Sequence, residues 1–398
     1  MTDFSSMWAE LAPIGRAGDG GYHRLAWTDA DRAAREWFRE QARRLGMVLD
    51  EDPNGNQWAW WGSPSPGAVV TGSHLDSVPG GGAFDGPLGV VSAFLAVDRL
   101  RHRRPVAVVN FADEEGGRFG VATLGSRLLT GSIGVERAAA LTDAAGVTLA
   151  EAWRANGLDP GRAGADPSRL GRVGVFVELH VEQGRRLVDA GVAVGVATAV
   201  WPHGRWRYEF TGRGDHAGTT RLSDRSDPVL PLARTVLAAR QAAEEAGAVA
   251  TVGRLAVRPG AVNAIASRAT AWLDARGPQE AVVRCVVEAV TESAEAAAAP
   301  HAVGVTVAEE SWSAGTTFGA DLRRRVAAAV QARLGSVTEL PTGAGHDAAV
   351  LAGAGVPAAM LFVRNPTGTS HDPAESASVE DCLAGVDALT AVLEDLLS

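Results

Sequence analysis

The 398-residue sequence contains no lysine, so all 37 of its lysine-plus-arginine residues are arginines. This absence excludes chemistry that needs a lysine amine, including Schiff-base catalysis and the lysine of a phosphate-binding loop. Any side chain that binds an anion through a permanent positive charge must therefore be an arginine. The planar guanidinium of arginine suits a carboxylate, which it can hold in two parallel hydrogen bonds.

Cysteines and long apolar runs are also scarce. The two cysteines, Cys285 and Cys382, lie far apart in apolar helical stretches, which predicts packed core thiols. No segment approaches the roughly 20 apolar residues that span a bilayer, and residues 1–15 lack the basic and apolar regions of a secretory signal. With a net charge of −10 and no basic stripe, the sequence predicts a cytoplasmic protein without a nucleic-acid or membrane partner.

Apolar strands alternate with helices over much of the chain. The predicted strands are the apolar runs 68–73, 106–111, 173–179 and 356–363. Helical periodicity covers 27–46, with Thr28 or Asp29 as the N-cap. A second predicted helix, 87–101, lies between the first two strands. This pattern predicts an α/β domain with a largely parallel sheet covered on both faces. In such sheets ligands bind beyond the carboxyl ends of the strands.

The middle of the chain has a different pattern. Helices at 227–246 and 279–297 alternate there with paired strand-like segments, which is typical of a small α+β sandwich. A chain of this length is also too long for one ordinary core. We therefore predict a catalytic domain formed by 1–203 and 313–398, interrupted by an inserted domain at 204–312.

Residues that bind metal ions gather where the predicted strands end. They are His74, Asp85, His180, His371 and one of the adjacent pair Glu114 and Glu115. Three imidazoles and two carboxylates are what a pair of divalent ions needs, and the remaining glutamate is then a base for an attacking water. The residues alone do not decide which glutamate binds metal and which is the base.

Each of these candidate ligand motifs, taken alone, is also compatible with a residue that has no metal-binding role. A histidine two residues before an aspartate is more often a solvated turn residue, and a pair of glutamates is usually an exposed helix start. The three glycines at 80–82 change this balance, because they let the backbone fold tightly and return Asp85 to the strand end that carries His74. Asp76 is then placed to accept the other imidazole N–H of His74 and to fix its tautomer.

The motifs EEGGRF, ELHVEQG, DHAGTT and SHDPAE resemble those of the superfamily of dinuclear-metal aminoacylases and carboxypeptidases. Within it they look like the amidase branch of N-carbamoyl-L-amino-acid hydrolases, β-ureidopropionase-like enzymes and allantoate amidohydrolases. The resemblance covers nearly the whole chain. It implies a metallopeptidase-like catalytic domain, an inserted lid or dimerisation domain and a homodimer. The implied metal ligands are His74, Asp85 as the bridge, Glu115, His180 and His371, with Glu114 as general base.

The resemblance also assigns roles outside the metal ligands. His216 in DHAGTT stands where the family polarises the scissile carbonyl, often from the partner subunit. Asn263 and Arg276 resemble the family's grip on the substrate carboxylate, a role that suits a guanidinium. Gln183 and His346 are further candidates for the lining of the substrate pocket.

The implied reaction is hydrolysis of the ureido C–N bond of an N-carbamoyl-L-amino acid or allantoate, with release of ammonia and carbon dioxide. The implied cofactors are two divalent ions, and mixed nitrogen and oxygen ligands suit zinc, manganese or cobalt. An N-formyl- or N-acyl-amino-acid hydrolase or a dipeptidase would share the same metal site. A non-catalytic binding protein is a further alternative, although its usual sign is a lost ligand or base. Asp215, where the branch commonly has asparagine, leaves the substrate side chain open.

Overall fold

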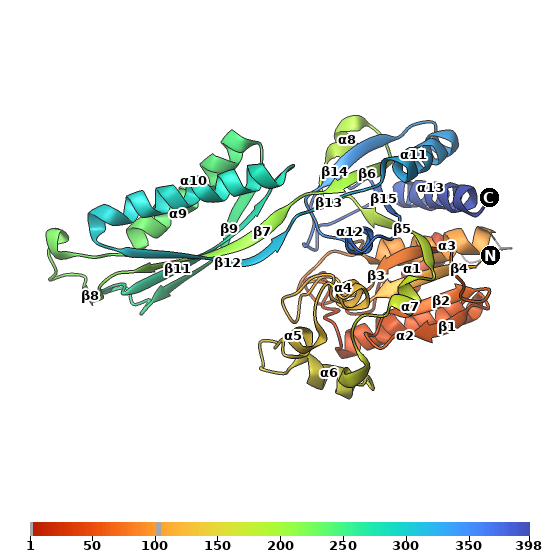
Figure 1. Ribbon diagram of the computed structural model, residues 1–398, viewed down its shortest axis with the longest axis horizontal. Helices are drawn as coiled ribbons and strands as arrows, with labels where there is room; N and C mark the ends of the chain where they lie inside the picture. The colour runs from red at the N-terminus through yellow and green to blue at the C-terminus, as the bar shows by residue number, and fades with distance from the viewer. Residues whose placement is uncertain (1–2, 101–104) are drawn as a thin grey trace. The chain divides into compact units, whose positions relative to one another are not determined.

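The computed structural model describes residues 3–100 and 105–398, so the predicted helix end at residue 101 lies outside the described residues (Figure 1). The chain forms two compact units. Unit 1 consists of Met1–Ala199 and Thr317–Ser398, and unit 2 consists of Val200–Thr316. In the part of the chain that is described, no helix combines the length and the apolar character needed to cross a membrane.

Unit 1 is built on a nine-stranded sheet whose four central strands are parallel. In spatial order these strands are β4 (Val106–Phe111), β3 (Ala68–His74), β5 (Val173–Val181) and β15 (Ala358–Val363). All four correspond to the strands predicted from apolar runs. Every residue of β3, β4 and β15 is buried, which is the pattern of parallel strands covered on both faces.

Further strands extend this sheet on both sides. They are β1 (Val48–Glu51), β2 (Gln57–Trp61), β6 (Val194–Val200), β13 (Thr316–Thr317) and β14 (Thr338–Thr342). β2 joins β4, and β6 joins β15, in antiparallel orientation. Parallel pairing joins the four strands at the centre of the sheet, which is where the candidate ligands originate.

Long helices cover the sheet of unit 1. They are α1 (Phe4–Leu11), α2 (Asp29–Arg44), α3 (Pro87–Leu100), α11 (Ala320–Leu334) and α13 (Val379–Leu397). α2 begins after Thr28, whose hydroxyl accepts the N–H of Asp31, so Thr28 is the N-cap. Apolar side chains of α3 and α13, such as Phe94 and Leu389, are fully buried in the main core.

Short helices occupy much of the remainder of unit 1. They are α4 (Leu124–Thr130), α5 (Val135–Ala139), α6 (Leu149–Ala155), η1 (Pro160–Arg162), α7 (Pro167–Leu170), α8 (Arg186–Ala190) and α12 (Asp347–Gly353). Residues of α4, α5 and α6, together with Trp27 and Phe119, form a separate small core that includes Trp153. α4 and α12 contribute side chains close to the candidate ligands, as described below.

Unit 2 contains a four-stranded antiparallel sheet. Its spatial order is β12 (Gly304–Ser313), β7 (His203–Thr211), β11 (Arg268–Arg276) and β9 (Val249–Arg258). Helices α9 (Val229–Ala246) and α10 (Glu280–Ala298) lie along one face of this sheet and share a core with it (Figure 1). Its smaller elements are β8 (Asp215–His216), η2 (Leu222–Asp224), β10 (Ala264–Ile265) and η3 (Ala299–His301). The predicted fold class, a mainly parallel α/β sheet plus a separate α+β layer, is confirmed.

The two cysteines differ in burial. Cys382 on α13 is buried as predicted, whereas Cys285 on α10 is exposed. Val283 and Val286 of α10 are buried in the core of unit 2, and Cys285 points away from that face. The prediction of a core thiol at Cys285 is therefore wrong, because an apolar neighbourhood in the sequence does not determine which face of a helix a residue occupies.

Candidate metal centre

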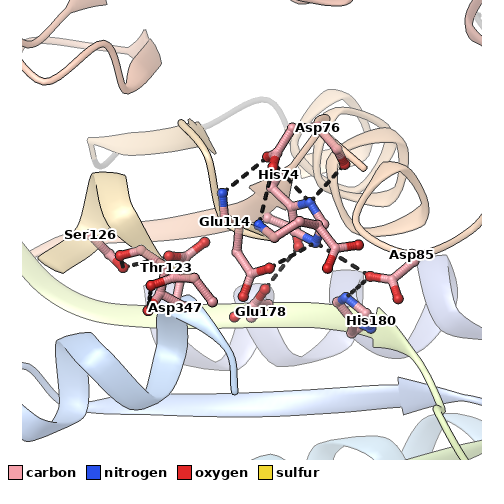
Figure 2. Close-up of polar contacts among 12 residues, drawn as sticks. His74, Asp76, Asp85, Glu114, Thr123, Ser126, Glu178, His180 and Asp347 are labelled. Carbon is pink, nitrogen blue, oxygen red and sulfur yellow. Dashed lines mark hydrogen bonds and ion pairs between the residues drawn. The ribbon is translucent and has the colours of Figure 1, made fainter. Parts of the chain in front are cut away.

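Two buried histidines lie at the carboxyl ends of adjacent parallel strands. His74 is the last residue of β3, and His180 is the penultimate residue of β5. We expected both to follow their strands, whereas the structure places them on the final residues of the strands themselves. Their rings are 5.8 Å apart between centroids and nearly without solvent exposure (Figure 2).

Main-chain carbonyls fix the tautomer of both rings. His74 Nδ1 lies 3.2 Å from the carbonyl oxygen of Asp76, and His180 Nδ1 lies 2.9 Å from that of Val181. A carbonyl oxygen only accepts hydrogen bonds, so each Nδ1 carries the proton and each Nε2 of the neutral ring keeps its lone pair. Both Nε2 atoms are buried and make no hydrogen bond, which is the state of a histidine prepared to bind a metal ion.

Asp85 faces both of these nitrogens with one carboxylate oxygen. Its Oδ1 lies 3.1 Å from His180 Nε2 and 3.5 Å from His74 Nε2. Burial alone would raise the pKa of Asp85, but the nearby charge of His180, together with that of His74, lowers it well below its usual range. His74, Asp85 and His180 thus form a three-residue group whose ligand atoms lie within 4.8 Å of one another.

A second three-residue group uses the other oxygen of the same aspartate. Asp85 Oδ2 and Glu115 Oε2 lie 3.5 Å and 3.4 Å from His371 Nε2, and the ligand atoms of the three residues again fall within 4.8 Å. His371 is about half exposed, with 49% of its side chain accessible. The structure therefore brings together all five predicted ligands, in two groups that share Asp85.

Asp76 has a different task from the one expected. The contact of His74 Nδ1 goes mainly to the main-chain oxygen of Asp76, since its carboxylate lies farther away at 3.6 Å. The two carboxylate oxygens instead accept the successive N–H groups of Glu114 and Glu115, each at 3.1 Å. Asp113, immediately before them, has a positive φ of 53°. This conformation lets two neighbouring N–H groups point at one anion.

Glu114 is a buried carboxylate beside the first group. Its Oε2 lies 3.7 Å from His74 Nε2, and the residue is 5% exposed. Burial raises the pKa of Glu114 well above its usual range, and the negative charges of Asp347 and Glu115 add to this effect. A carboxylate in this state accepts a proton readily, which is the property required of a general base near neutral pH.

The residues present fit a pair of divalent cations. Burial alone would keep the His74 ring neutral, but the negative charge of Glu114 and contacts with Asp76 and Asp85 outweigh it and raise the pKa of His74 well above its usual range. The surroundings therefore favour positive charge at this position, and the buried Nε2 lone pairs supply nitrogen ligands for it. The chain thus contains a His/Asp cluster suited to metal ions.

Gln183 and His346, predicted to line a pocket, both lie at this centre. Gln183 donates from Nε2 to Asp85 Oδ2 at 2.7 Å. The His346 ring is buried 4.6 Å from the ring of His180, and its Nε2 has no hydrogen-bond partner. Burial lowers the pKa of His346 well below its usual range, and the nearby charge of His180 adds to this. His346 is therefore a neutral ring packed against a candidate ligand.

Two carboxylates around the centre, Glu178 and Asp347, were not among the site residues predicted from the sequence. Glu178 accepts the hydroxyl of Ser73 at 2.8 Å and the N–H of Ala348 at 3.0 Å. Asp347 accepts a short hydrogen bond from Ser126 (Figure 2). A period-two signal was available for Glu178, because residues two apart on a strand share a face and His180 is two residues later. Asp347 gave no comparable signal, since it meets Ser126 only in the folded chain.

In unit 2, His216 and Asn263 lie on a small exposed ribbon. β8 pairs with β10 so that His216 is opposite Ala264, and the main-chain oxygen of Asn263 accepts the N–H of Ala217. The N–H groups of Gly218 and Thr219 donate to His216 Nδ1 at 3.0 and 3.2 Å. Nδ1 is therefore an acceptor, and the proton of the neutral ring resides on Nε2, where it is available to a ligand.

Arg276 is the last residue of β11, opposite His203 of β7. Its guanidinium holds Asp274 in a bidentate pair, with distances of 2.7 and 3.0 Å. Partial burial alone would raise the pKa of Asp274, but the hydrogen bonds and charges of Arg276 and Arg205 lower it. Arg276 thus has a fixed orientation on the sheet face, because residues two apart on a strand point the same way.

Curated relatives match almost the whole chain. An N-carbamoyl-L-amino acid amidohydrolase from Geobacillus stearothermophilus is 36% identical over 389 residues, covering 96% of this chain and 94% of that protein. A ureidoglycolate hydrolase from Arabidopsis thaliana is 32% identical over 405 residues, covering 97% of this chain and 84% of the relative. Both are named hydrolases, which confirms the prediction of a hydrolase related to this branch.

Solved structures share the fold at similar identity. The crystal structure of an amidase of the hydantoinase/carbamoylase family from Burkholderia vietnamiensis has a TM-score of 0.88 and 32% sequence identity, covering 100% of this chain and 98% of that chain. The model of the peptidase family M20/M25/M40 matches residues 70–395. That span includes all five candidate ligands as well as Glu114 and His216. The chain belongs to the peptidase family M20/M25/M40, and the amidases and amidohydrolases named above are its relatives.

Proposed function

We propose that the chain is a dinuclear-metal amidohydrolase that cleaves the ureido C–N bond of a small carboxylate-bearing substrate, an N-carbamoyl-L-amino acid or allantoate. The observation that carries this proposal is the pair of ligand groups that share Asp85, with Glu114 buried beside them. When bound, two divalent ions would acidify a water molecule and polarise the substrate carbonyl. Zinc, manganese and cobalt all suit these nitrogen and oxygen ligands.

Glu114 is the general base in this proposal. It accepts a proton from the attacking water, the C–N bond to the amine breaks, and Glu114 returns the proton to the leaving nitrogen. The products are the amine and carbamic acid, which decomposes to ammonia and carbon dioxide. The contact of Glu114 with His74 and its raised pKa support this assignment.

Residues of unit 2 complete the proposal. His216 donates its Nε2–H to the carbonyl oxygen as negative charge develops there, and its contacts with Gly218 and Thr219 support this tautomer. Asn263 and Arg276 bind the substrate carboxylate, for which a guanidinium is the only permanent cation that this lysine-free chain offers. A homodimer in which His216 acts from the partner subunit and a cytoplasmic location belong to the same proposal.

The test is a substrate panel with two readouts. Chain loaded with manganese is incubated with N-carbamoyl-L-amino acids, allantoate and ureidoglycolate, and ammonia release is measured. N-formyl- and N-acetyl-amino acids and dipeptides are assayed in parallel for the released acid or amino acid. We expect ammonia from at least one ureido compound and none with Glu114→Gln. Formate, acetate or amino acid release without ammonia from any ureido compound would assign the chain to the acyl-hydrolase alternative.

A further inference from the structure

Asp85 is held by contacts from two distant segments of unit 1. Its main-chain N–H donates to Glu375 Oε1 at 3.0 Å, and the neighbouring N–H of Phe84 donates to the same oxygen at 2.8 Å. On the side chain, Oδ2 accepts from Gln183 at 2.7 Å and from Ser370 at 3.2 Å. None of these contacts uses Oδ1, which remains directed at the two buried imidazoles.

Glu375 itself is a carboxylate in an unusual position. It is 4% exposed and forms no salt bridge among the described residues, although the charges of Arg24 and His180 act on it from a longer range. Its oxygens instead accept hydrogen bonds from backbone N–H groups and from the hydroxyl of Ser370. A second buried carboxylate beside Asp85 is unfavourable unless positive charge is near. The arrangement is thus better suited to organising a cation site than to stabilising the fold.

Gly82 makes this contact sterically possible. A Cβ at position 82 would lie 2.3 Å from Glu375 Cδ and Oε1 and 2.5 Å from its Cβ. These distances are far inside van der Waals contact, and the Glu375 Cβ lies next to its own backbone, where it cannot swing away freely. Glu375 therefore reaches the N–H of Asp85 only because residue 82 has no side chain. Within the glycine run at 80–82, the third glycine therefore makes room for the side chain of Glu375.

Glu375 also joins two loops that carry different ligands. His371 lies four residues before it, and Ser370 Oγ lies 3.5 Å from Glu375 Oε2 as well as 3.2 Å from Asp85 Oδ2. His74 is instead paired with Phe111 of β4, and His180 is paired with Phe362 of β15, so both are held within the parallel sheet rather than by this junction. The group that contains His371 is therefore the one whose geometry relies on Glu375.

We propose that Glu375 is a positioning residue that fixes Asp85 against His371, with Gly82 as its steric counterpart. Its loss weakens ion binding at the group of Asp85, Glu115 and His371 more than at the group of His74, Asp85 and His180. The inference rests on the proposed function for the presence of two ions and is independent of which bond is cleaved. Contacts that orient a ligand in this way are worth about 10- to 100-fold in metal affinity.

The experiment is a calorimetric titration of the metal-free full chain with manganese alone. Glu375→Ala is expected to weaken manganese binding at the group of Asp85, Glu115 and His371 by about 10- to 100-fold. The titration then shows one weakened equivalent, and the other equivalent is nearly unchanged. Glu375→Gln retains an acceptor oxygen for the two N–H groups and restores most of the affinity. Gly82→Ala reproduces the loss, and adding it to Glu375→Ala causes no further loss, because both changes break one contact. Glu380→Ala, at an exposed position of the same segment, is the matched control.

Equal weakening of both equivalents, no weakening of either, or a Gln variant as impaired as the Ala variant would overturn the proposal. Circular dichroism and the thermal midpoint of the metal-free variants show whether they fold. If Glu375→Ala does not fold, the titrations of Gly82→Ala and Glu375→Gln test the proposal in its place. A wild-type chain that binds two manganese ions but releases no ammonia refutes the proposed reaction and leaves this titration decisive. A wild-type chain that binds fewer than two ions overturns the inference as well.

Discussion

The candidate residues of unit 1 and unit 2 differ in how the fold holds them. His74, His180 and Asp85 are at most 5% exposed and sit on or beside the central strands. His216 and Asn263 are exposed, on a ribbon whose strands have two residues each. Metal ligands need fixed relative positions, which a buried parallel sheet supplies. The proposed substrate contacts of His216 and Asn263 need access to solvent, which an exposed ribbon supplies.

The largest expected effect comes from Glu114, the proposed base in unit 1. Glu114→Gln is isosteric and removes only the ability to accept a proton, so kcat is expected to fall by about a thousandfold while both ions stay bound. Turnover measured together with metal content by elemental analysis checks this expectation. Near-normal turnover in the metal-loaded variant would remove Glu114 from the role of base.

A pair of histidine variants tests the contrast between the units directly. His180→Ala deletes a buried Nε2 ligand and is expected to lower the bound metal from two equivalents towards one. His216→Ala is expected to keep both ions and to lower kcat by about a hundredfold, since it removes one donor to the developing oxyanion. Metal content and kcat of both variants are the readouts. Metal loss in His216→Ala, or full metal occupancy in His180→Ala, would contradict the assignment of metal binding to unit 1 and of oxyanion stabilisation to unit 2.

A smaller effect is expected at the arginine of unit 2. Arg276→Lys keeps the charge but cannot span two carboxylate oxygens, so KM is expected to rise about tenfold with little change in kcat. Asp274→Ala should raise KM in the same direction, because Asp274 holds the guanidinium in a bidentate pair. Arg268→Lys, at the start of the same strand, is the control and should leave KM unchanged. A fall in KM for Asp274→Ala would mean that this carboxylate competes with the substrate.

The two cysteines provide the mildest test, without any effect on activity. Burial raises the pKa of Cys382 to about 12, with the charge of Asp381 adding to this, whereas Cys285 is exposed. The thiolate is the reactive form, so at pH 8 only about one in ten thousand Cys382 thiols is ionised, and the packed core also keeps the reagent away from it. A thiol reagent is expected to label one cysteine per folded chain and two after denaturation. Rapid labelling of both in the folded chain would show that α13 opens readily.

The sequence predicted the parts of the fold whose signal is local. The four apolar runs are the four parallel central strands, and the helix after Thr28 begins at its predicted cap. The short antiparallel strands β1 and β2 were not predicted, because β1 is defined by its pairing with β2, and β2 by its pairing with β4. The same limit explains Cys285, whose helix was predicted although its face was not.

The candidate centre shows a similar boundary. Ligand-type residues at strand ends were visible in the sequence, and family resemblance separated Glu114 from Glu115. The contact of Glu375 with the N–H of Asp85 spans 290 residues and has no sequence signal of its own. Asp76 was expected to orient His74, and its carboxylate turned out to hold the two glutamates. Residue types in the sequence can predict that a site exists, but the role of each atom depends on hydrogen bonds between segments that meet only in the folded chain.

The sharing of Asp85 has a thermodynamic consequence. One carboxylate contributes an oxygen to each ligand group, so the affinity of either group for an ion depends on whether the other group is filled. Linkage requires this influence to be mutual and equal in both directions. The two ions of such a centre would not load as independent events, and a chain supplied with a mixture of metals could favour one pairing over another. Selectivity would then be a property of the pair rather than of either group alone.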